Sequence, residues 1–137
     1  METQLTPYLN FRNTARTAME FYQSVLGGKL TFNTFKEFNA AESPEEENLI
    51  MHSMLETENG IIIMAADVPD RMELNVGNNF NMMLGGDNQT ELTTNFEKLS
   101  QNGTVLMPLN KQIWGDIFGS FVDQFGINWM VNITVPK

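Results

Sequence analysis

The sequence predicts an α+β fold in which one β-α-β-β-β module occurs twice. Two observations support this: a strand, turn and strand over residues 53–64 recur over residues 120–130, and an amphipathic helix precedes each copy. The overlay places Ser120, Phe121, Val122, Asp123, Gly126, Ile127 and Met130 on Ser53, Met54, Leu55, Glu56, Gly60, Ile61 and Met64, with one extra residue before the first glycine. Because helix and turn match in the same order, the pattern indicates an internal duplication.

The first module is predicted over about residues 4–67. Asn13 or Thr14 offers an N-cap, and Gly27-Gly28 provides a left-handed helix end. Between them, apolar residues spaced three and four apart form one helix face: Ala15, Ala18, Met19, Tyr22, Val25 and Leu26. We expect strands over residues 5–11, 29–38, 49–56 and 60–66.

The second module is predicted over about residues 79–134, after a loop over residues 67–78. We expect strands over residues 79–84, 104–106, 119–122 and 127–133, and a helix over residues 90–101. Phe96 and Gly103 repeat the seven-residue spacing of Phe21 and Gly28. In the last strand one face carries Ile127, Trp129, Val131 and Ile133, and we expect it to pack against a helix.

Composition restricts the class of protein. A chain of 137 residues with 42% hydrophobic residues fits one domain with a buried core. It has no cysteine, and its net charge of −9 disfavours nucleic acid and anionic membranes as partners. No segment resembles a signal peptide or a membrane span, so a cytoplasmic protein is expected. The acidic run ESPEEE, residues 42–47, is predicted to be a solvated loop tip.

Three segments resemble the PhnB-like branch of the vicinal-oxygen-chelate superfamily: PYLNF, FYQSVLGG and MPLNKQIWGDIFGSFVDQFGINWMVN. That superfamily includes glyoxalase I, fosfomycin and bleomycin resistance proteins, and extradiol dioxygenases. The resemblance implies two β-α-β-β-β modules that form a curved mixed sheet around a central cavity, usually in a homodimer. PhnB-like sequences are often labelled methyltransferases, but no glycine-rich loop follows the first predicted strand to hold a methyl donor.

The resemblance also implies positions for metal ligands, which are mostly His and Glu in relatives that use a metal. The first-strand position falls on Pro7, and its counterpart in the second module falls near Asn79 or Asn81. The family pattern Asp-x-x-Gly-x-x-x-Glu ends on Met130, and the duplication adds Met64. Proline, amide and thioether groups do not suit a hard divalent cation. We therefore predict no metal site at the family position and no cofactor.

The candidate binding residues combine aromatic, amide and thioether groups. His52, the only histidine, has the pKa range of an acid or base, but it is also typical of a half-exposed strand residue. Trp114, in a glycine-bounded loop, suits stacking on a flat ligand, packing on a dimer partner or closing the end of its own sheet. We expect a groove lined by His52, Asn79, Asn81, Trp114, Phe118 and Met130.

Three functions remain open at this point. The first is metal-free binding of a small molecule, flat or cationic, in an apolar groove; it resembles the bleomycin resistance proteins and suits the negative charge. The second is a lyase, isomerase or dioxygenase with a displaced metal site, for example around His52 and Glu56. The third is an interaction module that retains the fold without a ligand.

Overall fold

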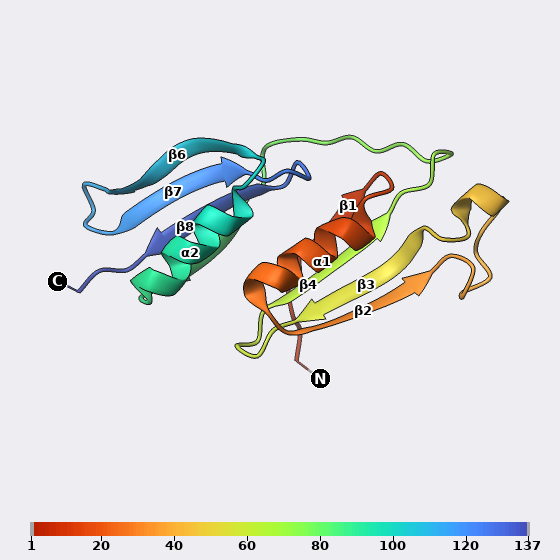
Figure 1. Cartoon of the computed structure of the whole chain (residues 1–137), viewed down its shortest axis with the longest axis horizontal. Coiled ribbons are helices and arrows are strands. Elements are labelled where there is room, and N and C mark those ends of the chain that lie inside the picture. Colours follow the sequence, from red (N-terminus) through yellow and green to blue (C-terminus); the bar gives the residue numbers. More distant parts are fainter. Residues whose placement is uncertain (1, 137) are drawn as a thin grey trace. The chain divides into compact units, whose positions relative to one another are not determined.

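The protein is described here from a computed structural model, which describes residues 2–136. The chain forms two compact units: unit 1 ends at Asn75 and unit 2 begins at Val76. Each unit contains a four-stranded mixed sheet and one α-helix (Figure 1). The predicted α+β class and the repeated β-α-β-β-β order are confirmed.

Unit 1 contains a sheet with the strand order β1-β4-β3-β2. Only the β1–β4 pair is parallel. Its elements are β1 (Tyr8–Phe11), α1 (Ala15–Leu26), β2 (Lys29–Thr34), the 3-10 helix η1 (Pro44–Glu46), β3 (Ile50–Glu56) and β4 (Ile62–Asp67). The predicted strand over residues 29–38 ends early, at Thr34, because the chain turns there and the backbone N–H of Phe38 donates to the Thr34 carbonyl.

Unit 2 repeats this topology with the strand order β5-β8-β7-β6, and its β5–β8 pair is the parallel one. Its elements are β5 (Met82–Gly86), α2 (Gln89–Leu99), β6 (Thr104–Lys111), β7 (Ile117–Val122) and β8 (Asn128–Ile133). The strand predicted over residues 79–84 begins later, at Met82, where pairing with Trp129 of β8 begins. β6 is longer than predicted because it follows β7 as far as Lys111.

Each helix packs on one face of its own sheet and leaves the opposite face free of helix (Figure 1). In unit 2 the predicted face is confirmed, since Trp129, Val131 and Ile133 of β8 are buried and α2 packs on β8. The rings of Phe121 and Trp129 stack, with centroids 6.3 Å apart. We call the opposite surface of each sheet its helix-free face.

The start of α1 is held by tertiary structure and not by the predicted N-cap. Thr14 occupies the N-cap position, but its side chain makes no capping hydrogen bond. Asp67, at the end of β4, accepts instead from the backbone N–H of Ala15 and from that of Ile50, each at 2.9 Å. One buried carboxylate therefore joins the helix start to β3 and β4.

The two strand turns are equivalent, but the predicted overlay is out of register by one residue. Gly60 and Gly126 both have φ +89°. Their backbone N–H groups donate to the carbonyls of Thr57 and Asp123, at 3.1 and 3.0 Å. Thr57, and not Glu56, is thus the counterpart of Asp123, so no extra residue is needed. The predicted overlay followed the similarity of residue types, whereas the turn hydrogen bonds show which residues of the two copies correspond.

Of the two correspondences predicted between the modules, the glycine pair is confirmed and the phenylalanine pair is wrong. Gly28 and Gly103 are equivalent, because each packs against the backbone that enters its turn, at Glu56–Thr57 and Val122–Asp123 respectively. Phe21 and Phe96 are not equivalent, since Phe21 is half-buried and Phe96 is 6% exposed. The four buried residues of α1 correspond in order to the four of α2. Those of α1 are Ala15, Ala18, Met19 and Tyr22, and those of α2 are Leu92, Asn95, Phe96 and Leu99.

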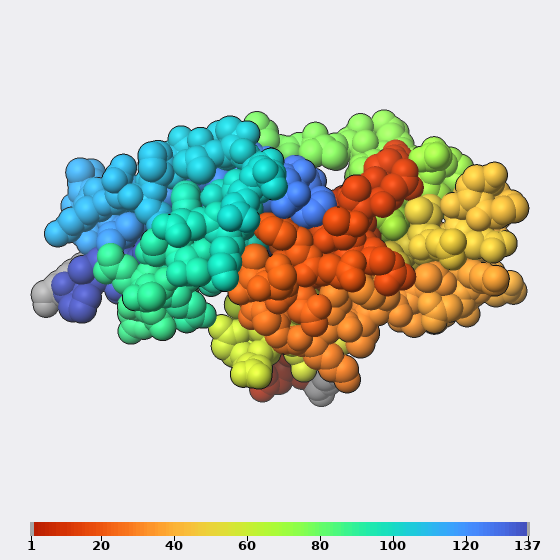
Figure 2. Space-filling view, viewed as in Figure 1, coloured from red at the N-terminus to blue at the C-terminus, as the bar shows by residue number. Residues whose placement is uncertain are grey.

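The acidic run departs from the predicted solvated loop tip. It forms η1 at the surface of unit 1 (Figures 1 and 2), yet Glu46 is only 8% exposed. Arg71 donates to Glu46 at 3.1 Å and also pairs with Glu42 at 3.0 Å. The run is therefore partly buried through an arginine that lies 25 residues away in sequence from Glu46. No helix between residues 2 and 136 has the length and apolarity needed to cross a bilayer.

Candidate functional site

The helix-free face of unit 2 brings together two of the predicted binding residues, Phe118 and Met130. Met130 of β8 lies between Met83 of β5 and Ser120 of β7, and Ser120 pairs in turn with Met107 of β6. We call Met83, Met130 and Met107, with Ser120 between the last two, the methionine row. It crosses the sheet, and Met83 and Met107 are 60% and 42% exposed. Thioether side chains are flexible and polarisable, so the row is a surface that adapts to an apolar ligand.

A second row lies next to the methionine row on the same face. Asn132 of β8 pairs with Gly85 of β5 and with Phe118 of β7, which pairs with Asn110 of β6. Trp114, in the β6–β7 turn, contacts Phe118 edge to face, with ring centroids 6.0 Å apart. Because Trp114 is 52% exposed, its ring is accessible to a ligand. Phe118 is thus part of the second row, and with Trp114 it forms an aromatic pair beside the methionine row.

The predicted binding residues include neither Asn132 nor Asp116, which also belong to this face. The Asn132 amide Nδ2 donates to Asp116 Oδ2 at 3.1 Å, and the backbone N–H of Val135 donates to Asp116 Oδ1 at 3.4 Å. Asn132 lies two residues after Met130 in β8, so strand alternation places both side chains on one face. The hydrogen bond to a residue 16 positions away had no sequence signal.

Asn79 and Asn81 lie outside the rows. Both precede β5, Asn79 is exposed and Asn81 is half-buried. The residue paired with Met130 across the parallel ladder is Met83. The sequence estimate was displaced because the strand begins later than its composition suggested.

His52 lies on the helix-free face of unit 1. Its ring is 6.2 Å from that of Tyr8, and it pairs with Asn33 of β2. Partial burial raises the pKa of the Tyr8 phenol above its ordinary value of 10.0, so this group stays protonated near neutral pH. The pair thus offers a neutral hydroxyl beside an imidazole.

Glu56 shares that face, but it is four residues from His52 along β3. At roughly 3.3 Å per residue the two residues are about 13 Å apart, which is too far to hold one ion. Among residues 2–136, no three His, Cys, Asp or Glu side chains form a group that could hold a metal ion. The displaced site around His52 and Glu56 is therefore not formed by these two residues.

The family metal positions also fail to fit a metal. In unit 1, Met64 pairs with Tyr8, while Pro7 contributes only its carbonyl, which accepts from the backbone N–H of Met64 at 3.0 Å. In unit 2, Met130 pairs with Met83. Thioethers and a protonated phenol do not suit a hard divalent cation. These residues therefore do not form the site found in metal-using relatives.

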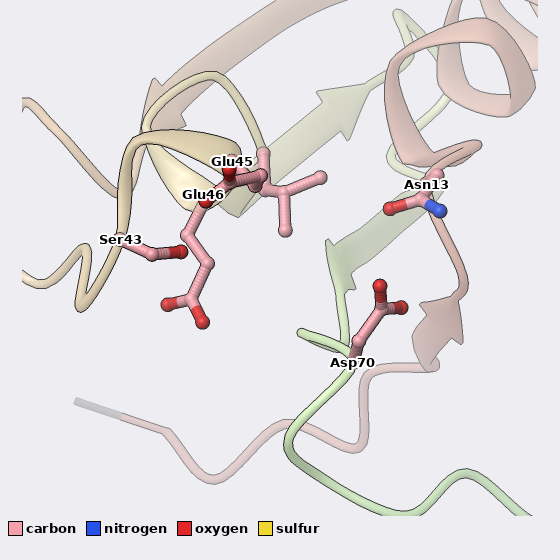
Figure 3. A pocket seen from close by; sticks show the side chains of 6 residues that line it. Asn13, Ser43, Glu45, Glu46 and Asp70 are labelled. Atoms are coloured by element: carbon pink, nitrogen blue, oxygen red, sulfur yellow. The ribbon is translucent and has the colours of Figure 1, made fainter.

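Unit 1 also contains an open pocket of about 250 Å³, away from the predicted residues. Figure 3 shows Asn13 and Asp70 on one side and Ser43, Glu45 and Glu46 on the other. The two neighbouring arginines already have carboxylate partners, since Arg71 pairs with Glu46 and Arg12 lies 3.9 Å from Asp70. The pocket is polar and acidic, unlike the methionine row.

Comparison with known proteins decides the family. The sequence model of the Glyoxalase/Bleomycin resistance protein/Dioxygenase superfamily matches residues 5–131. The chain belongs to this superfamily. It is 27% identical to Protein YjdN from Escherichia coli (strain K12), over 94% of each chain.

Solved structures agree with this assignment. Protein PA1353 from Pseudomonas aeruginosa has a TM-score of 0.82 and 32% identity, over 96% of this chain and 98% of that one. A PhnB protein from Bacillus cereus, described as a putative 3-demethylubiquinone-9 3-methyltransferase, has a TM-score of 0.73 and 24% identity, over 96% and 100%. The structural neighbours thus include PhnB-like proteins, as the sequence motifs predicted.

Proposed function

We propose that the protein binds a flat organic molecule without breaking a bond, on the helix-free face of unit 2. The observation that carries this proposal is the methionine row bordered by the Trp114–Phe118 pair. Such a surface offers a polarisable floor and an aromatic edge, which suit an apolar ring. The net charge of −9 favours a cationic ligand over an anionic one.

Other superfamily members support the choice of binding over metal chemistry. The superfamily name includes bleomycin resistance proteins as well as enzymes. The positions that the resemblance assigns to metal ligands carry Pro7, Asn79 or Asn81, Met64 and Met130, and the pairing partners of the two methionines are Tyr8 and Met83. We further propose, on the family resemblance alone, a cytoplasmic homodimer; light scattering after size exclusion would test the dimer.

Trp114 makes the binding proposal testable with a matched control. The wild type, Trp114→Ala and Ile113→Ala would be titrated with proflavine and acridine orange, two flat cationic dyes, with dye anisotropy as the readout. Ile113, beside Trp114 in the same turn, is 103% exposed, so its truncation should leave both affinities unchanged. Loss of the indole face should weaken binding about fivefold, since an aromatic contact contributes about 1 kcal/mol.

Tryptophan emission gives a second readout. Trp129 is 1% exposed and its indole N–H donates to Asp123 at 2.8 Å, so its emission should respond little to ligand. Quenching should therefore be smaller in Trp114→Ala than in the wild type. If neither dye binds saturably to the wild type, the proposal is wrong. Stoichiometric transition metal in protein purified without chelators would favour a metal enzyme instead.

A further inference from the structure

We infer that Asn132 is a specificity-determining residue, whose side-chain carbonyl accepts a hydrogen bond from an N–H or O–H group at the edge of the bound ring. The inference rests on the proposed function, because it concerns the same face of unit 2. It assigns the ligand to a narrower class, that of planar molecules with a hydrogen-bond donor on the ring periphery.

The hydrogen bond to Asp116 determines how the Asn132 amide is oriented. An ionised carboxylate only accepts hydrogen bonds, so the atom facing Asp116 Oδ2 at 3.1 Å must be the amide nitrogen. Asp116 is itself held by the backbone N–H of Val135. The carboxylate thus fixes which end of the amide is turned away from it, and that end is the carbonyl oxygen Oδ1.

This oxygen is accessible to solvent. Asn132 Oδ1 accepts no hydrogen bond from any residue in the described part of the chain. Asn132 is half-buried, and no side-chain oxygen or nitrogen among residues 2–136 is both buried and without a partner. Oδ1 must therefore reach solvent. An oriented acceptor without a protein partner is available to a ligand.

Asn132 has two neighbours across the sheet. On one side is Gly85, where an added Cβ would meet only ordinary contacts, the nearest at 3.8 Å to the Asn132 backbone oxygen. On the other side is Phe118, the inner member of the aromatic pair. A ring lying over the adjoining Met130 can thus present its edge to Asn132, because no side chain on Gly85 blocks the approach.

The test compares two dyes that differ in the relevant donors. Both cations keep a protonated ring N–H, but proflavine also carries two amino groups that donate, whereas acridine orange carries dimethylamino groups that cannot. The wild type, Asn132→Leu and Asp116→Asn would be titrated with both dyes. The readout is the ratio of the two dissociation constants, because a general loss of structure or charge would change both affinities together.

The four methyl groups of acridine orange also affect its affinity, so the expected effect is a change of the ratio relative to the wild type. Asn132→Leu should weaken proflavine relative to acridine orange about fivefold, as loss of one net hydrogen bond provides, and leave acridine orange binding within about twofold. Asp116→Asn should change the ratio in the same direction by a smaller factor, because the amide of Asn132 can then rotate. Circular dichroism would check folding, and the Asp116 variant tests the same inference if Asn132→Leu does not fold.

Two results overturn the inference in distinguishable ways. If Asn132→Leu or Asp116→Asn retains the wild-type ratio of the two dissociation constants while both dyes still bind, Asn132 does not set specificity and the binding function stands. If neither dye binds to the wild type, the proposed function and this inference fail together.

Discussion

Asp123 is predicted to be the most sensitive polar residue of unit 2. Asp123 is 3% exposed, and at least three donors hydrogen-bond to its carboxylate. The donors are the backbone N–H groups of Phe125 at 2.8 Å and Ile127 at 3.0 Å, and the Trp129 indole at 2.8 Å. Replacing Asp123 with alanine leaves all three donors without this acceptor.

The size of the effect follows from the burial of each donor. The two backbone groups lie in a part-buried turn, where water can replace the carboxylate in part, so each costs about 1 kcal/mol. The indole N–H of Trp129 lies in a buried bond and costs about 2 kcal/mol. We expect Asp123→Ala to lower the free energy of unfolding by about 4 kcal/mol, a large fraction of the total for a small protein.

Thr57, the counterpart in unit 1, provides the matched comparison. Its hydroxyl accepts from the backbone N–H of Ile61 at 3.0 Å, in an equivalent turn, and donates to Asn59 Oδ1, which is on an exposed residue and can bond to water instead. Thr57→Val retains the shape of the side chain and should cost about 1 kcal/mol. Asp123→Asn presents either an oxygen or a nitrogen to Trp129 and should have an intermediate effect.

Urea unfolding followed by far-UV circular dichroism would measure all three variants. Emission of Trp129 in a Trp114→Phe background would report on unit 2 itself, where both tryptophans lie. If Asp123→Ala costs no more than Thr57→Val, the reasoning from donor burial is refuted.

Two further predictions concern the close backbone contact at Gly103 and the buried carboxylate of Glu46. Gly103→Ala should lower the free energy of unfolding in urea by at least about 2 kcal/mol, because the new Cβ meets the carbonyl of Val122. Gly77→Ala, the control, should change it by no more than about 0.5 kcal/mol. Equal costs for the two variants would contradict this reasoning. For Glu46, burial alone would raise the pKa, but hydrogen bonds from Arg71 and the Glu42 backbone and the Arg71 charge lower it below 4.5. The ionised Glu46 side chain therefore stabilises the folded state above pH 4.5, and this stabilisation is lost as the pH falls through the lowered pKa. Between pH 5 and pH 3 the free energy of unfolding should fall less in Glu46→Gln than in the wild type. The same pH dependence in both proteins would show that Glu46 contributes little.

Most of the fold could be predicted because its signals are local. The helix face of Ala15 to Tyr22 and the alternation around Trp129 follow from the periods of helix and strand. Register could not be predicted in the same way, since Thr57 and Asp123 share a hydrogen-bond role and not a chemical type. The late start of β5 depends on pairing with β8, which residue composition does not specify.

Of the candidate site, the sequence identified residue types, and pairing decided which of them are neighbours. Phe118 and Met130 share one face, Trp114 joins them, and Asn79 and Asn81 fall outside the strand. Asn132 and its partner Asp116 were not identified, since their contact joins two segments of the chain.

The sequence by itself determined the duplicated module, because the module depends on local periodicity. Its motifs also resemble the family, and the positions that this resemblance assigns to metal ligands carry side chains whose chemistry does not suit a hard cation. Only the tertiary structure decided the register of the two copies, the methionine row through Met83 and Met130, and the orientation of Asn132 by Asp116. These features depend on contacts between distant segments, and the free energy of such contacts is set by the folded geometry.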